Sequence, residues 1–258
     1  MVKCNFCDGK TLLKVKIKFW KIYQCKNCKI SFLYPIPEKI EQIYNQKYFE
    51  RWYLPTYQQR KKYLEKIFLR IEPYISQNGK VLDIGCGIGI LLELMREKGF
   101  EVIGQDISQF SIESCKKKGF KVYSSINNIN SENQFDIITM IDVIAHLKEP
   151  SNYLQKCKKL LKPNGFLIIK TPLHSNFFFF ITKIFSFIEK SKSILHIPAQ
   201  IYHFDKNSFF KISKLFDLKL VKIFIIKEFI DKKINFLNIW KFFMEKSLVV
   251  ILQNGKEK

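Results

Sequence analysis

The sequence predicts an α/β fold: a seven-stranded, mostly parallel sheet with helices on both faces, preceded by a small metal-binding unit. Two observations support this prediction. From residue 80 onward, short apolar runs alternate with amphipathic helical stretches, which is typical of a parallel sheet covered on both sides. Ahead of that alternation, two Cys-x-x-Cys pairs lie between residues 4 and 28. The 258 residues suffice for one substantial domain with a small appendage.

The first expected unit is residues 1–34. Cys4, Cys7, Cys25 and Cys28 form the two pairs, and the intervening TLLKVKIKFWKIYQ alternates apolar side chains with lysines, as a hairpin strand does. Two pairs at this spacing are typical of a zinc ribbon, a unit too small to fold without its metal. We therefore expect the four cysteines to bind a structural zinc ion, with a four-cysteine iron centre as the alternative.

The second expected unit, residues 35–77, is a helical linker or lid. The prolines of YPIP interrupt the chain just after the ribbon. Helices are then predicted over residues 38–49 and 58–74, where apolar side chains recur at helical spacing. Stripes of this kind usually pack against a core, so we expect both helices to cover the domain that follows.

Residues 78–258 form the main expected domain. Strands are predicted at 81–84, 100–105, 120–123, 135–141, 166–170, 218–226 and 247–252, and helices at 88–98, 108–118, 150–161 and 208–216. Gly99 and Gly119 are expected to end the first two of these helices. The aromatic stretch 176–204 is interpreted as a lid over an acceptor pocket or as an interfacial insertion resting on a membrane.

A glycine-rich loop follows the first of these strands, in the run VLDIGCGIG. Gly85, Gly87 and Gly89 leave bare backbone beside a ligand, but Ile90 stands where a dinucleotide-binding loop has its third glycine. Asp83 would repel a pyrophosphate, whereas its carboxylate can accept hydrogen bonds from an ammonium group. These features favour a nucleotide with an amine-bearing, positively charged end, and S-adenosyl-L-methionine fits them.

Four segments resemble the successive motifs of class I S-adenosylmethionine-dependent methyltransferases: DIGCGIG, GQDIS, FDIITMIDVIAHL and LLKPNGFLIIKTP. They occur in the family's order and spacing, over about residues 78–175. The resemblance implies a Rossmann-like fold and cofactor-binding roles for Asp83, Gly85, Gly87, Gly89, Asp106, Ile107 and Met140. In it, Asp83 and the glycines contact the methionyl part and ribose, Asp106 holds the ribose diol, Ile107 packs on adenine, and Met140 lines the sulfonium pocket.

The acceptor side is similar to a subset that carries a zinc ribbon and modifies small molecules such as sugars or quinone-like rings. IPAQIYHFDKNSFFKI resembles that subset's PEHLYHFS stretch, but Ala199 and Gln200 stand in place of its glutamate and histidine. His146, just beyond the fourth strand, is the candidate general base; a purely structural role remains open. Ala145 beside it replaces a carboxylate of the family pattern.

The expected activity is methyl transfer to oxygen or carbon of a small-molecule, sugar or lipid-linked glycan acceptor. The alternatives are an rRNA or tRNA base methyltransferase and a catalytically weakened paralogue that still binds the cofactor. The formal charge of +21 is compatible with nucleic acid or with peripheral contact with an anionic membrane, but much of it can reflect compositional bias. No secretory signal or transmembrane segment is recognised, so a cytoplasmic location with reduced cysteines is expected.

Overall fold

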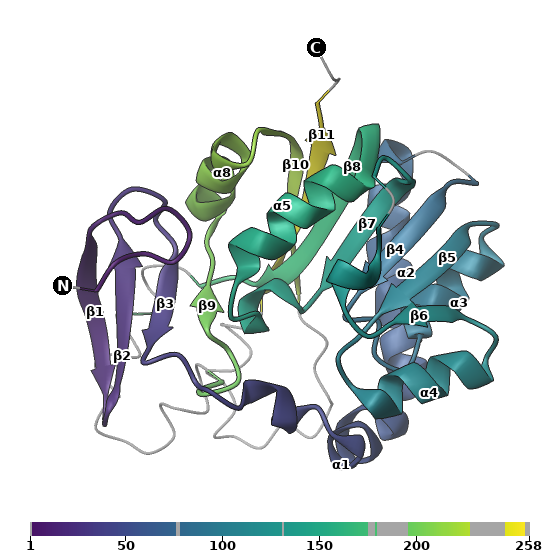
Figure 1. Ribbon diagram of the computed structural model, residues 1–258, viewed down its shortest axis with the longest axis horizontal. Coiled ribbons are helices and arrows are strands. Elements are labelled where there is room, and N and C mark those ends of the chain that lie inside the picture. The colour runs from purple at the N-terminus through teal and green to yellow at the C-terminus, as the bar shows by residue number, and fades with distance from the viewer. Residues whose placement is uncertain are drawn as a thin grey trace.

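A four-stranded sheet and a seven-stranded sheet lie side by side in the computed structural model (Figure 1). The structure describes residues 2–75, 78–130, 132–174, 179, 196–227 and 246–255. Most of the aromatic stretch 176–204, including its predicted lid or membrane-contacting part, lies outside the described residues. Among the described residues, no helix combines the length and apolar character that a membrane span requires.

The larger sheet has the strand order β10-β11-β8-β7-β4-β5-β6. Its strands in chain order are β4 (Lys80–Ile84), β5 (Glu101–Gln105), β6 (Lys121–Tyr123), β7 (Phe135–Ile141), β8 (Leu161–Pro172), β10 (Leu218–Lys227) and β11 (Lys246–Asn254). The five strands from β8 to β6 are parallel, while β11 pairs antiparallel with both β8 and β10. The predicted seven-stranded, mostly parallel sheet is confirmed.

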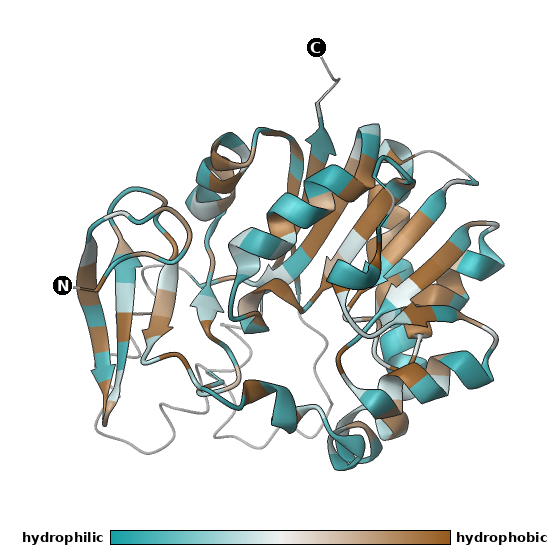
Figure 2. Cartoon of the chain, in the orientation of Figure 1, coloured by the Kyte–Doolittle hydropathy of each residue, from teal (hydrophilic) through white to brown (hydrophobic). Residues whose placement is uncertain are grey.

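Helices cover both faces of this sheet. One face carries α2 (Tyr57–Ile71), α3 (Ile90–Glu97) and α4 (Gln109–Lys117), and the other carries α5 (Pro150–Leu160) and α8 (Lys206–Leu215). Figure 2 shows the central strands mostly hydrophobic, while the helices alternate between hydrophilic and hydrophobic positions. The two apolar layers on either side of the sheet form the core, as burial of both sheet faces requires.

Several helix ends follow the signals in the sequence. Gly99 and Gly119 lie in the left-handed region, with φ of 88° and 78°, directly after the C-cap residues of α3 and α4. Asp205 caps α8: its carboxylate accepts a hydrogen bond from the Ser208 N–H, and the Ser208 hydroxyl accepts one from the Asp205 N–H. The predicted glycine stops are therefore confirmed.

The helix predicted over residues 38–49 is wrong. The chain instead forms short turns: η1 (Ile40–Ile43), α1 (Gln46–Tyr48), η2 (Phe49–Tyr53) and η3 (Leu54–Thr56), followed by α2 and then η4 (Glu72–Tyr74). Asn45 caps the start of α1, because its side chain accepts a hydrogen bond from the Tyr48 N–H at 3.2 Å. The other short turns are η5 (Ile126–Asn128) and η6 (Ile144–His146).

The smaller sheet has the order β1-β2-β3-β9. Its first three strands are β1 (Thr11–Ile17), β2 (Trp20–Cys25) and β3 (Ser31–Tyr34), and they form an antiparallel meander that contains the predicted hairpin. The fourth, β9 (Tyr202–His203), comes from far along the chain and pairs with β3. A strand of the main domain therefore completes the N-terminal sheet (Figure 1).

Candidate functional site

The glycine loop joins β4 to α3 at the carboxyl edge of the parallel strands. Gly85 has a φ of +70°, and a Cβ atom added to it would lie 2.3 Å from a methyl carbon of Val143. Gly89 has a φ of +85° and is the N-cap of α3. A side chain at either position would strain the turn, so glycine is required for the chain to pass from the strand into this helix.

Asp106, just beyond β5, binds the backbone of the glycine loop at Gly87. Its two carboxylate oxygens accept hydrogen bonds from the N–H groups of Gly87 at 2.8 Å and Ser108 at 2.9 Å. Burial raises the pKa of this carboxyl, and the backbone donors oppose that shift. Since a carboxylate has more acceptor sites than these two bonds use, Asp106 can also receive ligand hydroxyls.

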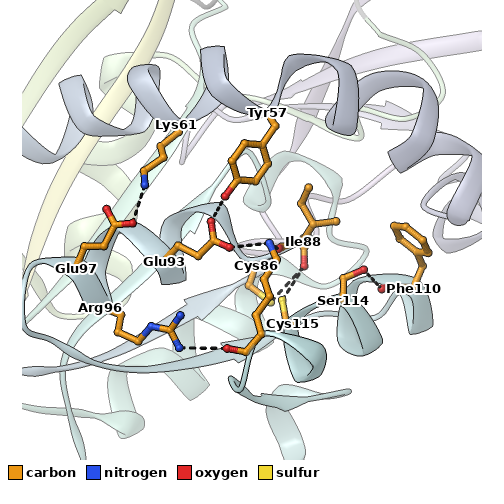
Figure 3. Close-up of polar contacts among 12 residues, drawn as sticks. Tyr57, Lys61, Cys86, Ile88, Glu93, Arg96, Glu97, Phe110, Ser114 and Cys115 are labelled. Atoms are coloured by element: carbon orange, nitrogen blue, oxygen red, sulfur yellow. Dashed lines mark hydrogen bonds and ion pairs between the residues drawn. The ribbon is translucent and has the colours of Figure 1, made fainter.

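Helix α4 holds the loop from behind. The Cys115 thiol donates to the Gly87 carbonyl at 3.2 Å, and the Lys118 ammonium donates to the Ile88 carbonyl at 2.7 Å. Figure 3 shows these contacts beside Glu93, which accepts hydrogen bonds from Tyr57 and, at 2.8 Å, from Lys118. The loop is therefore held by α4, and through Glu93 the same network reaches α2.

Asp83 lies beneath the loop and is buried. The Thr139 hydroxyl donates to its carboxylate at 2.6 Å. Burial raises the pKa of Asp83 to about 7; the Thr139 hydrogen bond opposes the shift and the negative charge of Asp106 adds to it. A cationic ligand group beside Asp83 would favour the ionised carboxylate.

A cavity of about 180 Å³ opens between the loop and α2. Its charged lining residues are Asp83, Asp142, Arg60 and Lys170, and tyrosine rings from Tyr53 and Tyr63 complete the wall toward α2. Two carboxylates and two cations thus face one enclosed space beside bare backbone. This arrangement can bind a ligand that itself carries both charges.

Arg60 enters the cavity from α2 with its side chain already fixed. Its Nε donates to the Thr56 hydroxyl at 2.9 Å, and its guanidinium lies 3.9 Å from the centre of the Tyr53 ring. None of these contacts neutralises the charge. Arg60 is therefore oriented in advance to receive an anionic ligand group.

Lys170, at the end of β8, and Asp142, just beyond β7, form an ion pair on the opposite wall. The Lys170 Nζ lies 2.8 Å from each carboxylate oxygen of Asp142. It also lies 5.5 Å from the centre of the Tyr63 ring. Asp142 adopts a φ of +59°, which turns the chain sharply where β7 ends. The pair links two central strands at the edge where parallel sheets bind ligands.

Aromatic side chains of residues 40–57, the lid segment, cover the glycine loop. Phe49 is 3% exposed, packs with Ile88 and Ile90, and stacks on Phe110 with ring centres 5.6 Å apart. Phe49 and Tyr53 also lie within 4 Å of the position that a Gly87 Cβ would occupy. The helical form predicted for this region differs in the structure, and its role as a lid stays a prediction.

His146 lies in η6 and is not among the residues that line the cavity. Its Nδ1 is 2.7 Å from the carbonyl oxygen of Ala199, and its ring centre is 6.1 Å from that of Tyr44. Because a carbonyl only accepts, Nδ1 carries the proton and Nε2 keeps a lone pair. Burial lowers the pKa of His146. Its assignment as general base stays a prediction.

The other residues expected to bind the cofactor lie at the same sheet edge in two different settings. Ile107 is 49% exposed just beyond β5, as a surface for a ligand ring requires. Met140 is fully buried in the apolar layer covered by α5, and the next residues, Ile141 and Asp142, line the cavity instead. Alternation along β7 explains the difference, because successive side chains point to opposite faces.

The four ribbon cysteines come together at the end of the smaller sheet where β1 begins and β2 ends. Their sulfur atoms all lie within 4.8 Å of one another, and the Cys4–Cys28 and Cys7–Cys25 pairs are each 3.5 Å apart. A tetrahedral four-thiolate zinc site has sulfur atoms about 3.8 Å apart. Backbone N–H groups of Phe6 and Asn27 point at the sulfurs of Cys4 and Cys25. The donor set fits a metal ion bound by four thiolates.

Sequence reasoning did not single out Arg60, Asp142 or Lys170 for this site. Arg60 sits on a helix interpreted only from its apolar stripe. Lys170 carried a usable signal, since it is a lysine at the carboxyl end of the apolar run FLII. A buried charge at that edge of a parallel sheet is a candidate site residue.

Comparison with known proteins gives one family. A family model described as a methyltransferase domain matches residues 57–218. The ubiquinone biosynthesis O-methyltransferase of Bradyrhizobium diazoefficiens is 34% identical over 99 residues, covering 36% of this chain and 39% of that protein. The enzyme of the same description from Vibrio cholerae is 28% identical over 151 residues, covering 55% and 58%. The chain thus matches less than two thirds of the length of these relatives.

A solved structure resembles nearly the whole chain. The 1,6-didemethyltoxoflavin-N1-methyltransferase of Burkholderia thailandensis, which contains 1,6-didemethyltoxoflavin and S-adenosylhomocysteine, superimposes with a TM-score of 0.55 at 13% identity. The match covers 93% of this chain and 97% of that one. At this identity the likeness concerns the fold.

Proposed function

Since this chain belongs to the methyltransferase-domain family, whose model it matches over residues 57–218, we propose that it transfers a methyl group from S-adenosyl-L-methionine to a small acceptor. The acceptor class is a small molecule, a sugar or a lipid-linked glycan, methylated on oxygen or carbon. The curated relatives, which are ubiquinone biosynthesis O-methyltransferases, support a small acceptor and transfer to oxygen.

The charge pattern of the cavity carries the proposal. The methionyl end of the donor is a zwitterion, with an ammonium and a carboxylate on one carbon. Asp83 beside the glycine loop suits the ammonium, and Arg60 on α2 suits the carboxylate. Asp106, held at the end of β5, suits the ribose hydroxyls, and the exposed Ile107 offers a surface for adenine.

The donor supplies a methyl carbon activated by its sulfonium. As the acceptor atom bonds to that carbon, the carbon–sulfur bond breaks and its electron pair stays on sulfur. The protein contributes chiefly by holding the two reactants in line, which supplies roughly 7–11 kcal/mol in well-oriented reactions. His146 Nε2 takes the acceptor proton and passes it to water, a step typically worth about 10²–10⁴-fold.

The ribbon cysteines are proposed to hold a structural zinc ion. The clustering of four thiols within 4.8 Å and the backbone donors to sulfur support this assignment. All four ligand positions are taken by protein, so the ion has no open site for chemistry.

Calorimetry with S-adenosylhomocysteine tests the donor site. Arg60→Met should weaken binding roughly 10–100-fold, because a charge-assisted hydrogen bond contributes about 1.5–3 kcal/mol. Arg70→Met is the matched control, since Arg70 lies on the same helix but is exposed and away from the cavity. Equal affinity in both variants, or no binding by the unaltered protein, would contradict the proposal.

Transfer from methyl-labelled donor tests the acceptor class. Catechol, a nucleotide sugar and total RNA serve as probes of the phenolic, glycan and nucleic-acid classes. Label appearing in either small molecule supports the proposal. Label confined to RNA would instead select the base-methyltransferase alternative, and binding without transfer to any acceptor tested would favour a weakened paralogue.

A further inference from the structure

The side chain of Tyr202 contacts both the zinc-ribbon unit, residues 1–34, and the loop that carries His146. We propose that Tyr202 is a positioning residue, which transmits metal binding at the four cysteines to the orientation of the His146 imidazole. The idea rests on the proposed function only in giving His146 a part in the reaction. The coupling itself concerns the geometry of the chain and can be measured without any acceptor.

On the ribbon side, Tyr202 packs against the turn that contains Cys4 and Cys7. The ring of Phe6, which lies between Cys4 and Cys7, meets the Tyr202 ring edge-on at 5.2 Å between centres. The side chain of Asn5 donates to the Tyr202 hydroxyl at 3.4 Å. In β3, Phe32 pairs with Tyr202, and the Leu33 N–H donates to the Ile201 carbonyl at 2.8 Å. The segment from Ala199 to Tyr202 is thus bound to the ribbon, a kind of unit that depends on its metal for folding.

On the other side, the same segment holds the His146 loop at three points. The Ile201 N–H donates to the Ala145 carbonyl at 2.8 Å. His146 Nδ1–H donates to the Ala199 carbonyl at 2.7 Å. The Tyr202 hydroxyl donates to the Lys148 carbonyl at 3.2 Å. The Tyr202 side chain thus touches both the turn that contains Cys4 and Cys7 and the loop that carries His146.

One buried cluster joins the two ends. It includes Cys4, Cys28, Tyr202, Ile144 and Ala145, all nearly or fully inaccessible to solvent. Close-packed interiors transmit a displacement at one end to the other, because they contain few voids to absorb it. Loss of the metal removes the constraint on Cys4 and Phe6, so the Tyr202 ring loses one of its packing partners and its hydroxyl becomes a less fixed donor to the Lys148 carbonyl.

The expected consequence is a change in which ring nitrogen of His146 carries the proton. The Ala199 carbonyl keeps the proton on Nδ1 and leaves Nε2 as the acceptor. When the segment containing Ala199 shifts, that hydrogen bond lengthens and the imidazole can exchange its proton between the two nitrogens. Metal binding therefore selects the tautomer whose Nε2 is free to accept a proton.

Nitrogen NMR of histidine-labelled full-length protein tests the coupling, because the chain has four histidines and each ring gives separate signals. A His146→Gln variant assigns the His146 signals. With zinc bound, the unaltered protein should show a single Nδ1-protonated form. Chelation should move or broaden the His146 signals toward a mixture of tautomers.

Tyr202→Phe separates coupling from simple loss of ribbon structure, since it removes only the hydroxyl that binds Lys148 and Asn5. With zinc bound, this variant should already show part of the change that chelation produces in the unaltered protein, and chelation should then add less. Tyr23→Phe is the matched control: Tyr23 lies in β2 and stacks near Phe32, yet has no bond to the 145–148 loop. It should respond to chelation like the unaltered protein.

Two results would overturn the proposal: His146 signals unmoved by chelation while ribbon amide signals shift, or Tyr202→Phe indistinguishable from Tyr23→Phe. A failure of this proposal can be distinguished experimentally from a failure of the proposed function. A protein that binds no S-adenosylhomocysteine yet shows the metal-dependent His146 change loses the function and keeps the coupling. A protein that binds and transfers methyl with an unresponsive His146 does the reverse.

Discussion

Lys170 and Asp142 form an ion pair whose two ends are unequally exposed. The Lys170 side chain is 2% exposed and that of Asp142 is 39% exposed, while Nζ lies 2.8 Å from each carboxylate oxygen. The backbone joins them as well, because the Asp142 N–H donates to the Lys170 carbonyl at 2.9 Å. Removing one partner therefore leaves a buried ammonium, whereas removing the other leaves a carboxylate that water can reach.

We expect Asp142→Asn to destabilise the protein by about 3 kcal/mol, because the buried Lys170 ammonium loses the carboxylate that it binds through both oxygens. Asparagine tolerates the positive φ at this position, so the substitution isolates the charge. Lys170→Met should cost only about 1 kcal/mol, since its methylene chain is replaced and Asp142 remains solvated. Urea unfolding at pH 7 measures both. A larger cost for Lys170→Met would contradict this assessment of the pair.

The raised pKa of Asp83, about 7, predicts a pH-dependent stability. An unfolded aspartate ionises near pH 3.8, so between that value and pH 7 the native state holds a proton that the unfolded state has released. Native stability from this group is therefore complete below about pH 4 and is lost as pH rises to 7, by roughly 4 kcal/mol in total.

Asp83→Asn removes that dependence while keeping an oxygen that can accept from Thr139. Its unfolding free energy minus that of the unaltered protein should thus increase between pH 4 and 8, by up to roughly 4 kcal/mol. Other titrating groups are common to both proteins and cancel in the difference. A flat difference across this range would show that Asp83 ionises normally in the native state.

Residues that act through local sequence were predictable. The glycines of the loop, Asp83 and Asp106 follow two strands directly, and the order of strands along a parallel sheet brings their ends together. The paired spacing of the four cysteines is enough to predict that they cluster. The seven strands and most helix ends follow from hydrophobic periodicity and from glycine or aspartate at the boundaries.

Residues that meet through tertiary packing were not predictable. Arg60 reaches the cavity because α2 packs on α3, and Lys170 meets Asp142 because β8 lies beside β7 in one register. Strand β9 joins the ribbon across about 170 residues of sequence, a pairing that leaves no local pattern. The short turns at 40–56 place aromatic side chains against the glycine loop. No helical period in the sequence encodes that arrangement.

A pair of glycine substitutions tests the strain assigned to the loop. Gly85→Ala combines a left-handed φ of +70° with a methyl group 2.3 Å from Val143, so we expect a loss of about 3 kcal/mol. Gly119→Ala has a similar φ of +78° but open space around the new methyl group, so about 1 kcal/mol is expected. Urea unfolding compares them, and equal losses would mean that Val143 yields without cost.

Phe49 covers Ile88 and Ile90 and lies beside Gly87, where the donor is proposed to bind. A ligand that approaches Gly87 from the Phe49 side must displace this ring, and exposing a buried phenylalanine costs about 1.5–3 kcal/mol. Phe49→Ala should therefore raise the association rate of S-adenosylhomocysteine at least tenfold, since 1.4 kcal/mol corresponds to a factor of about ten.

Stopped-flow mixing measures this rate, and the dissociation rate should rise as well because the bound ligand loses its cover. Leu54→Ala is the control: it lies in the same lid segment, is 48% exposed, and does not belong to the cluster on the loop. Its association rate should match that of the unaltered protein. If Phe49→Ala also leaves association unchanged, the ligand enters by a path that the ring does not block, and the lid segment serves only to stabilise the empty site.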